Sequence, residues 1–242
     1  DHPMSMRAFP RMMGMASLTA SFAQLEHSVR TGRPAFELVE PEGLFAHLQQ
    51  HPEEASIFAA SMTAKAAADI GAVLAAYDFS AFTTVADIGG GWGHLLRAVL
   101  EAAPDTNGIL FDLPEVVEAL DRDIERLSLR AGDFFVDALP RADAYILMEI
   151  IHDWDDAQAA AILTAVRRAA SPGATVLIIE AVADDEHINP VVHTLDMIML
   201  AITGGRERTS AELGQLIGSA GFRLTNVLET RGALRIVEAV AV

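Results

Sequence analysis

The sequence predicts an α/β domain whose mostly parallel sheet closes with an antiparallel hairpin at its carboxyl end and is preceded by a helical segment. Three observations lead to this prediction. Apolar strands alternate with helices from residue 83 onward, a glycine-rich turn joins the first strand to a helix, and a short turn separates the last two strands. We expect residues 1–80 to form the helical segment, acting as a linker, a substrate cap or a dimerisation segment, and residues 81–242 to form the sheet domain.

The composition restricts the partners of the chain. With 242 residues, 51% of them hydrophobic, the chain is long enough to bury a complete α/β core. The formal net charge of -17 repels a phosphate backbone, so we expect no nucleic acid partner. No apolar run approaches the roughly 18 residues of a membrane-spanning helix, so we expect no membrane partner. The chain contains no cysteine, which excludes disulfides and fits a cytoplasmic location.

Residues 1–80 carry helical patterns. Gly32 and Pro34 end the first helix, and further helices are predicted over 43–50 and from Pro52 to Leu74. Four apolar residues recur at the spacing of one face of the first helix: Leu18, Phe22, Leu25 and Val29. Five early methionines fill a core, form an interface with another subunit or line an apolar pocket: Met4, Met6, Met12, Met13 and Met15.

The remaining sequence alternates between strands and helices. Strands are predicted at 84–88, 107–111, 127–131, 144–148 and 174–180, and helices at 92–102, 114–126 and 155–170. The strands predicted at 222–229 and 233–241 flank a Thr-Arg-Gly turn. A turn this short joins antiparallel strands, so we expect a carboxyl-terminal hairpin.

The turn after the first strand is the strongest candidate for a binding site. It contains Asp87 followed by Gly89, Gly91 and Gly93, and a helix begins directly after it. Glycine allows a positive φ and a close approach of a ligand, and a helix N-terminus attracts anionic groups. The G-x-G-x-G spacing differs from the G-x-G-x-x-G of dinucleotide-binding turns, so a nicotinamide enzyme is the weakest alternative. A glycine-rich turn that binds nothing is the other alternative.

Acidic and aromatic residues follow the second and third strands. Ligands of open parallel sheets bind beyond the carboxyl ends of the strands, which is where these residues are expected. Asp112 either accepts hydrogen bonds from ribose hydroxyls or caps the next helix. Asp133 either accepts from an exocyclic amine or forms a turn, and Phe134 either lies against a purine face or packs in the core.

His152 follows the fourth predicted strand and is the candidate general base. Its ordinary pKa of about 6.5 leaves it mostly neutral at pH 7, so it can take a proton from a hydroxyl. The alternative is a loop histidine held by neighbouring acids. Glu180, at the end of the fifth strand, and Glu207 either orient the imidazole or are solvated or ion-paired acids. Asp155 is predicted to be the N-cap of the next helix.

Together these motifs resemble the class I S-adenosylmethionine (SAM)-dependent O-methyltransferases related to the plant caffeic acid, animal hydroxyindole and bacterial antibiotic enzymes. The resemblance covers the chain from about residue 28 to the end. Five ordered motifs carry it: residues 87–93, 111–114, 132–135, 151–155, and 204–209 together with 220–222. The upstream segment 29–36 is also typical of the family.

The resemblance implies a Rossmann-like SAM methyltransferase fold and a hydroxylated small-molecule acceptor. It implies that SAM is the cofactor, that its product is S-adenosylhomocysteine and that no metal takes part. The implied SAM-binding residues are Asp87, Gly89, Gly91, Asp112, Leu113, Asp133 and Phe134. The implied catalytic residues are His152, Glu180 and Glu207. The residues implied near the acceptor are Phe58, Met62, Asp196 and Met199.

The chain departs from the family pattern in two respects. Family members usually begin with a winged-helix dimerisation domain, which is absent here, so we expect a homodimer in the full-length form or a dimer formed by residues 1–30. Many members carry lysine where Met148 stands. Relatives with the same SAM site can perform hydroxylation or decarboxylation in secondary metabolism, and a catalytically inactive SAM-binding scaffold is the third alternative.

Overall fold

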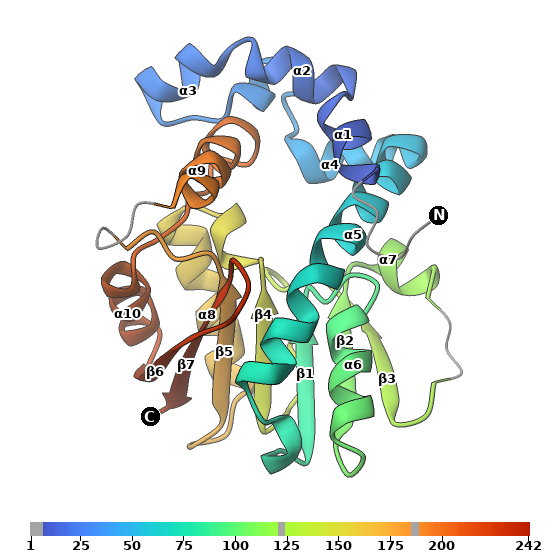
Figure 1. Ribbon diagram of the computed structural model, residues 1–242, viewed down its shortest axis with the longest axis vertical. Coiled ribbons are helices and arrows are strands. Elements are labelled where there is room, and N and C mark those ends of the chain that lie inside the picture. Colours follow the sequence, from blue (N-terminus) through green and yellow to red (C-terminus); the bar gives the residue numbers. More distant parts are fainter. Residues whose placement is uncertain (1–6, 121–123, 185–188) are drawn as a thin grey trace.

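The computed structural model describes residues 7–120, 124–184 and 189–242, whose strands form a seven-stranded sheet (Figure 1). The sheet order is β3-β2-β1-β4-β5-β7-β6. The first five strands are parallel, and β7 pairs antiparallel with both β5 and β6, so the predicted sheet and hairpin are confirmed. The strands are β1 (Thr84–Ile88), β2 (Asn107–Asp112), β3 (Leu127–Ala131), β4 (Ala144–Met148), β5 (Thr175–Glu180), β6 (Phe222–Glu229) and β7 (Arg235–Ala241).

The helices of the described residues fall into an amino-terminal group and a group that covers the sheet. The first group comprises α1 (Ala8–Met13), α2 (Ala16–Phe22), α3 (Leu25–Thr31), η1 (Ala35–Leu38), α4 (Leu44–Gln50) and α5 (Pro52–Ala76). The second comprises η2 (Phe79–Ala81), α6 (His94–Ala102), α7 (Pro114–Glu118), η3 (Ile151–Asp153), α8 (Asp156–Ala169), α9 (Pro190–Ile202) and α10 (Ser210–Ser219).

Two predicted helices differ from the structure. The helix predicted over 114–126 ends at Glu118, because the next N–H groups bond three residues back and tighten the last turn; residues 121–123 of that prediction lie outside the described residues. The first apolar stripe is divided between α2 and α3, which are separated by a turn at Gln24. Leu18 is buried, but Val29 is exposed because α3 projects from the molecule (Figure 1).

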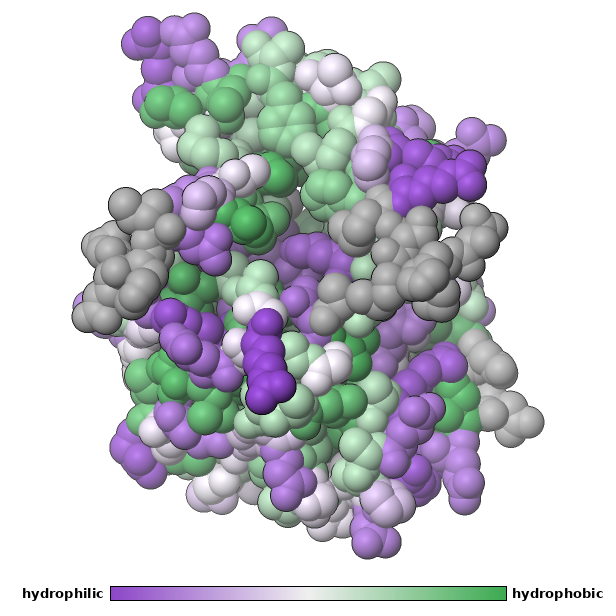
Figure 2. Space-filling view, in the orientation of Figure 1, coloured by the Kyte–Doolittle hydropathy of each residue, from purple (hydrophilic) through white to green (hydrophobic). Residues whose placement is uncertain are grey.

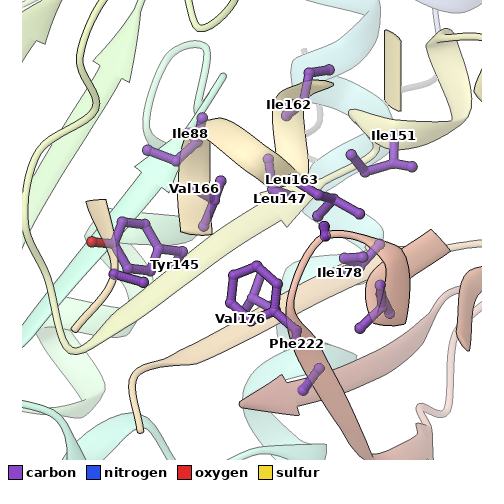
Figure 3. Close-up of a cluster of buried hydrophobic side chains, with 14 of the residues drawn as sticks. Ile88, Tyr145, Leu147, Ile151, Ile162, Leu163, Val166, Val176, Ile178 and Phe222 are labelled. Carbon is purple, nitrogen blue, oxygen red and sulfur yellow. The ribbon is translucent and has the colours of Figure 1, made fainter. Parts of the chain in front are cut away.

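Each face of the sheet has its own apolar core, because successive residues of a strand point to opposite faces. On one face, Ile146 and Leu177 pack with side chains of α5 and α6. On the other, Tyr145 and Ile178 pack with α8 and α10, and Figure 3 shows α8 side chains such as Leu163 meeting the strands there. Both faces of the parallel strands are therefore covered, as their continuous apolar sequences predict.

A separate apolar cluster joins the amino-terminal helices to α9 above the carboxyl ends of the parallel strands (Figure 1). Met12, Met15 and Phe36 are buried in it beside Ile202. Two of the early methionines therefore fill a core, while Met4 and Met6 lie outside the described residues. We call residues 7–67, which comprise α1–α4, η1 and the first part of α5, the helical cap.

A membrane-spanning helix requires both sufficient length and high mean hydropathy. No single helix among them meets both requirements. Two segments of α5, bent by 41° relative to each other, meet them only in combination. The second of these segments contributes Val73, which is fully buried against the sheet.

Candidate active site

The candidate site lies where the carboxyl ends of the parallel strands face the helical cap. Figure 2 shows a hollow between the two, with hydrophilic residues visible inside it. The glycine turn follows β1, Asp112 ends β2, His152 lies in η3 just after β4, and Glu180 ends β5. The sheet therefore brings together residues that are far apart in the sequence.

The glycine turn is held in one shape and is open on one side. Gly89 has a φ of 70°, and a Cβ there would lie 2.6 Å from the Ile150 side chain. Gly91 has a φ of 56°, and no described atom lies within 4 Å of where its Cβ would be. Asp112 fixes the turn by accepting hydrogen bonds from the N–H groups of Gly91 and Leu113, both at 2.7 Å. This leaves backbone room for a ligand at Gly91.

Asp87 is a buried carboxylate beneath this turn. It is 2% exposed and accepts no hydrogen bond from any described residue. Burial, and next the charge of Asp112, raise the pKa of Asp87 to about 7. A buried carboxylate without a partner is stabilised by a nearby cation, so the turn fits a ligand that carries positive charge, as SAM does.

The segment after β3 forms a turn with an aromatic cluster. The Asp133 carboxylate accepts from the N–H of Phe135 at 2.8 Å, which is the turn alternative for this residue. The ring of Phe134 lies edge-on to Trp154, with ring centroids 6.0 Å apart, and Phe45 of the cap stacks on Trp154 at 5.6 Å. Phe134 also lies near Gly89, so this cluster borders the glycine turn.

His152 is buried and uses one ring nitrogen for a structural hydrogen bond. Its Nδ1 lies 3.0 Å from Oε1 of Glu207, whose side chain is fully buried. The carboxylate selects the tautomer that is protonated at Nδ1. No described residue hydrogen-bonds to Nε2, and the Asp153 carboxylate lies 3.9 Å from it. Nε2 is therefore the nitrogen that can accept a proton from a substrate.

The expectation that His152 is mostly neutral at pH 7 is wrong, because the surrounding acids raise its pKa; its unprotonated form is a correspondingly strong base. Burial alone would lower the pKa of the imidazole, but the hydrogen bond that Nδ1 donates to Glu207 and the charges of Asp153, Glu180 and Glu207 outweigh this and raise the pKa to about 10. Burial, as the largest cause, raises the pKa of Glu180 to about 7 and that of Asp153 to about 6. These groups interact, so they titrate as a set.

The backbone around His152 is fixed by groups from two other segments. The Glu180 carboxylate accepts from the N–H groups of Ile151 and His152, and no described hydrogen bond joins it to the imidazole. The buried Arg208 guanidinium donates to the carbonyls of Ile151 and Trp154 at 3.0 and 2.8 Å. The chain contacts the His152 carbonyl so closely at Gly205 that a Cβ there would collide with it.

Arg208 and Gly205 belong to the motif at 204–209, but their roles were not predicted. The sequence does not show that this motif packs on the loop at 151–156. The two carbonyls to which Arg208 donates lie 57 and 54 residues before it in the sequence. A further pair, Lys65 and Glu149, was also missed. Lys65 of α5 forms an ion pair with Glu149, which directly follows β4.

The residues expected near the acceptor occupy two places. Phe58 and Met62 are half-buried on α5 and pack in the apolar cluster of the cap. Asp196 accepts a hydrogen bond from the N–H of Glu207 at 2.9 Å, so it positions the segment that holds His152. Met199 is half-buried on α9. The involvement of these side chains with an acceptor stays a prediction.

The comparisons with known proteins identify the family. A family model described as an O-methyltransferase domain matches residues 22–223. The phenazine O-methyltransferase of Lysobacter antibioticus is 39% identical over 98% of this chain and 71% of its own length. The O-demethylpuromycin-O-methyltransferase of Streptomyces alboniger is 38% identical over 94% of this chain and 63% of its own length.

A solved structure gives the same result. An O-methyltransferase from neocarzinostatin biosynthesis, in complex with SAM and 2-hydroxy-5-methyl naphthoic acid, superposes with a TM-score of 0.89 and 34% identity. The match covers 100% of this chain and 74% of that one. The predicted resemblance is confirmed, and the chain belongs to the O-methyltransferase domain family of SAM-dependent enzymes.

Proposed function

We propose that this chain transfers a methyl group from SAM to a hydroxyl of an aromatic or polyketide-like small molecule, with His152 as the general base. One observation carries the proposal: the unbonded Nε2 of a buried histidine lies at the sheet edge that also carries the open glycine turn. When bound, SAM supplies an electrophilic methyl group on a positively charged sulfur.

In this proposal, the residues around β1 and β2 hold the cofactor. The turn at Gly89 and Gly91 offers backbone room, and Asp112 keeps the turn in shape while retaining lone pairs for ligand hydroxyls. Asp87 compensates the positive charge of the cofactor. Phe134 supplies an apolar ring beside the turn. Asp133 holds the backbone after β3 by accepting from the N–H of Phe135, and the N–H of Leu113 holds the Asp112 carboxylate.

His152 prepares the acceptor. The hydroxyl O–H bond breaks as its proton moves to Nε2, and the oxygen becomes the nucleophile. The acids around His152 raise its pKa above the ordinary value, so its unprotonated form is a stronger base toward a phenol than a free imidazole is. Glu207 stabilises the resulting imidazolium through Nδ1, and Glu180 holds the backbone of the loop in place. A base of this kind contributes about 10²- to 10⁴-fold to the rate.

The helical cap forms the other side of the proposed acceptor site. Phe58 and Met62 of the cap provide apolar surface for a ring together with Met199 of α9, and Asp196 of α9 supports Glu207. The names of several relatives refer to phenazine, naphthoate and mitomycin chemistry, which supports an aromatic acceptor from antibiotic biosynthesis. We also propose that residues 1–80 act as cap and dimerisation segment of a homodimer and residues 81–242 as the catalytic domain.

The proposal is tested by incubating the purified protein with labelled SAM and a panel of phenols, naphthols and hydroxyquinones. We expect transfer of label to at least one acceptor and a product heavier by one CH₂. A product heavier by one oxygen would instead identify a hydroxylase. Tight SAM binding in calorimetry, with no product from any acceptor, would identify an inactive SAM-binding protein.

A further inference from the structure

Lys65 is the single lysine of the sequence, and it lies beside the proposed catalytic residues. The other 16 of the 17 basic side chains are arginines. The Lys65 side chain is 20% exposed, although lysine is among the residues that proteins bury least often. A residue type that occurs once in the chain, and there partly buried beside the proposed catalytic residues, points to a local chemical role.

Lys65 lies on the face of α5 that is directed toward the candidate active site. Phe58, Met62, Lys65 and Asp69 follow one another at intervals of four, three and four residues, which places them on one face of the helix. Phe58 and Met62 belong to the apolar cluster of the cap. Lys65 therefore lies at the boundary between the apolar cap and the acids that end the sheet.

Four acids interact with the ammonium group, one of them Asp69 of the same helix. Its Nζ donates to Oε1 of Glu149, and the charges of Asp153 and Glu207 also act on it. Burial alone would lower the pKa of Lys65, but Glu149 and the other acids outweigh this and raise it above its usual value. Lys65 is therefore charged throughout the neutral range. Its nearest charged neighbours include the carboxylates that contact His152.

The partner of Lys65 is itself held in an unusual conformation. Glu149 has a φ of 54°, a left-handed value that is rare outside glycine, and its N–H bonds to the carbonyl of Ile179 at 2.9 Å. Such strain persists where the surroundings enforce it and is concentrated at functional sites. The strained backbone turns the Glu149 carboxylate toward α5 and anchors the ammonium at the end of β4.

The ammonium has hydrogen-bonding capacity left over. It has three N–H donors, and among the described residues Glu149 is its one hydrogen-bond partner. Buried donors need acceptor atoms, so an oxygen of a bound molecule is the complementary group. A further carboxylate would be repelled by Glu149, Asp153 and Glu207, whereas a neutral carbonyl oxygen accepts the bond without adding charge.

We propose that Lys65 is a specificity-determining residue that donates a hydrogen bond to a carbonyl oxygen of the acceptor, next to the hydroxyl that receives the methyl group. This inference rests on the proposed function and names its acceptor class as hydroxyaryl ketones and quinones. In such molecules the hydroxyl donates to the neighbouring carbonyl. When Lys65 takes over the carbonyl, the hydroxyl proton becomes available to Nε2 of His152.

The kinetic test compares two acceptors of nearly equal shape, 1-hydroxy-2-acetonaphthone and 2-ethyl-1-naphthol. We expect Lys65→Met to lower kcat/KM about 10- to 100-fold for the ketone and to leave the ethyl compound nearly unaffected. Arg235→Met is the matched control, because it removes a similarly buried ion pair, with Asp184, outside the site. It should leave the ratio of the two acceptors unchanged.

A binding test requires no turnover. Protein labelled with ¹³C at lysine Cε gives one lysine side-chain signal, which is absent from Lys65→Met. We expect the ketone to shift this signal and the ethyl compound to shift it much less. Equal shifts, or an unchanged ratio of acceptors in Lys65→Met, would overturn the assignment of Lys65. A tenfold loss of SAM affinity in Lys65→Met with an unchanged acceptor ratio would overturn it in favour of a cofactor contact.

The two proposals fail in different ways. If no acceptor of the panel is methylated but the ketone shifts the lysine signal, the contact of Lys65 with the carbonyl oxygen stands and the methyl-transfer proposal fails. If both acceptors are methylated and Lys65→Met slows them equally, methyl transfer stands and the assignment of Lys65 fails. Thermal melting of each variant identifies any loss of folding.

Discussion

Two buried histidines among the described residues pair with glutamates, His47 in the helical cap and His152 beside β4. Their side chains are 4% and 6% exposed, and each has a nitrogen about 3 Å from a carboxylate oxygen. Burial and a His–Glu pair therefore do not distinguish a proposed catalytic base from a structural residue.

The difference lies in the second nitrogen and in the burial of the carboxylates. The other nitrogen of His47 lies 3.4 Å from Glu40, and its ring stacks on His51 with centroids 3.9 Å apart, so both nitrogens and one face of the ring lie beside side chains of the cap. Its carboxylate partners are 28% and 38% exposed and are screened by water. The Glu207 side chain is fully buried, so water does not screen the effect of its charge on the pKa of His152.

The largest expected effect separates the two histidines by activity. His152→Gln removes the proposed base, so we expect kcat to fall by about 10² to 10⁴ while the affinity for SAM is retained. His47→Gln should leave kcat unchanged. Steady-state kinetics with one methylated acceptor, together with calorimetric SAM titration, measures both. Equal rates for His152→Gln and the unaltered protein would remove His152 from its role.

A smaller effect on kcat is expected when the buried carboxylate of Glu207 is replaced. Glu207→Gln keeps an oxygen for Nδ1 but removes the charge that raises the pKa of His152. The base must be unprotonated to act, so kcat rises as the pH approaches its pKa. Because the variant lowers that pKa, the rise should move to lower pH, and the weaker base should reduce the alkaline rate by about 10-fold. A pH profile of kcat that stays in place would show that Glu207 does not tune His152.

The smallest effect concerns the cap. Burial alone would raise the pKa of Glu54, but its hydrogen bonds with His47 and Ser17 outweigh this and lower the pKa below the usual 4.5. The ionised Glu54 carboxylate therefore stabilises the folded state above pH 4.5. This stabilisation is lost as the pH falls through the lowered pKa. Glu54→Gln should reduce the free energy of unfolding by about 0.5 kcal/mol at pH 7, because the pair is partly exposed. Denaturant melts at pH 7 and pH 3.5 measure this difference, and kcat should not change.

The sequence predicted the sheet closely because its strands are continuous apolar segments bounded by polar turns. The bounds of β1 and β4 were predicted to the residue. Helix ends were harder to predict, because the end of α7 depends on local hydrogen bonds rather than on an apolar pattern. The predicted N-cap at Asp155 is confirmed by its bond from the N–H of Gln158.

The site was predictable only where a motif carried it. His152 and Glu207 were found in this way, and the structure places them 3.0 Å apart. Lys65 was missed because its partner is 84 residues away and nothing in the helical pattern of α5 marks the residue. A single lysine in a chain with 17 basic residues was the signal that could have identified it.

The buried Arg208 has a consequence for the engineering of this chain. Its guanidinium joins the start, the middle and the end of the segment from Ile151 to Asp156 through two carbonyls and one carboxylate. An insertion or deletion within that segment would change the spacing between these attachment points, so Arg208 could not keep all three. Libraries that aim at new acceptors should therefore diversify the cap-facing positions of α5 and α9 and keep this loop at its natural length.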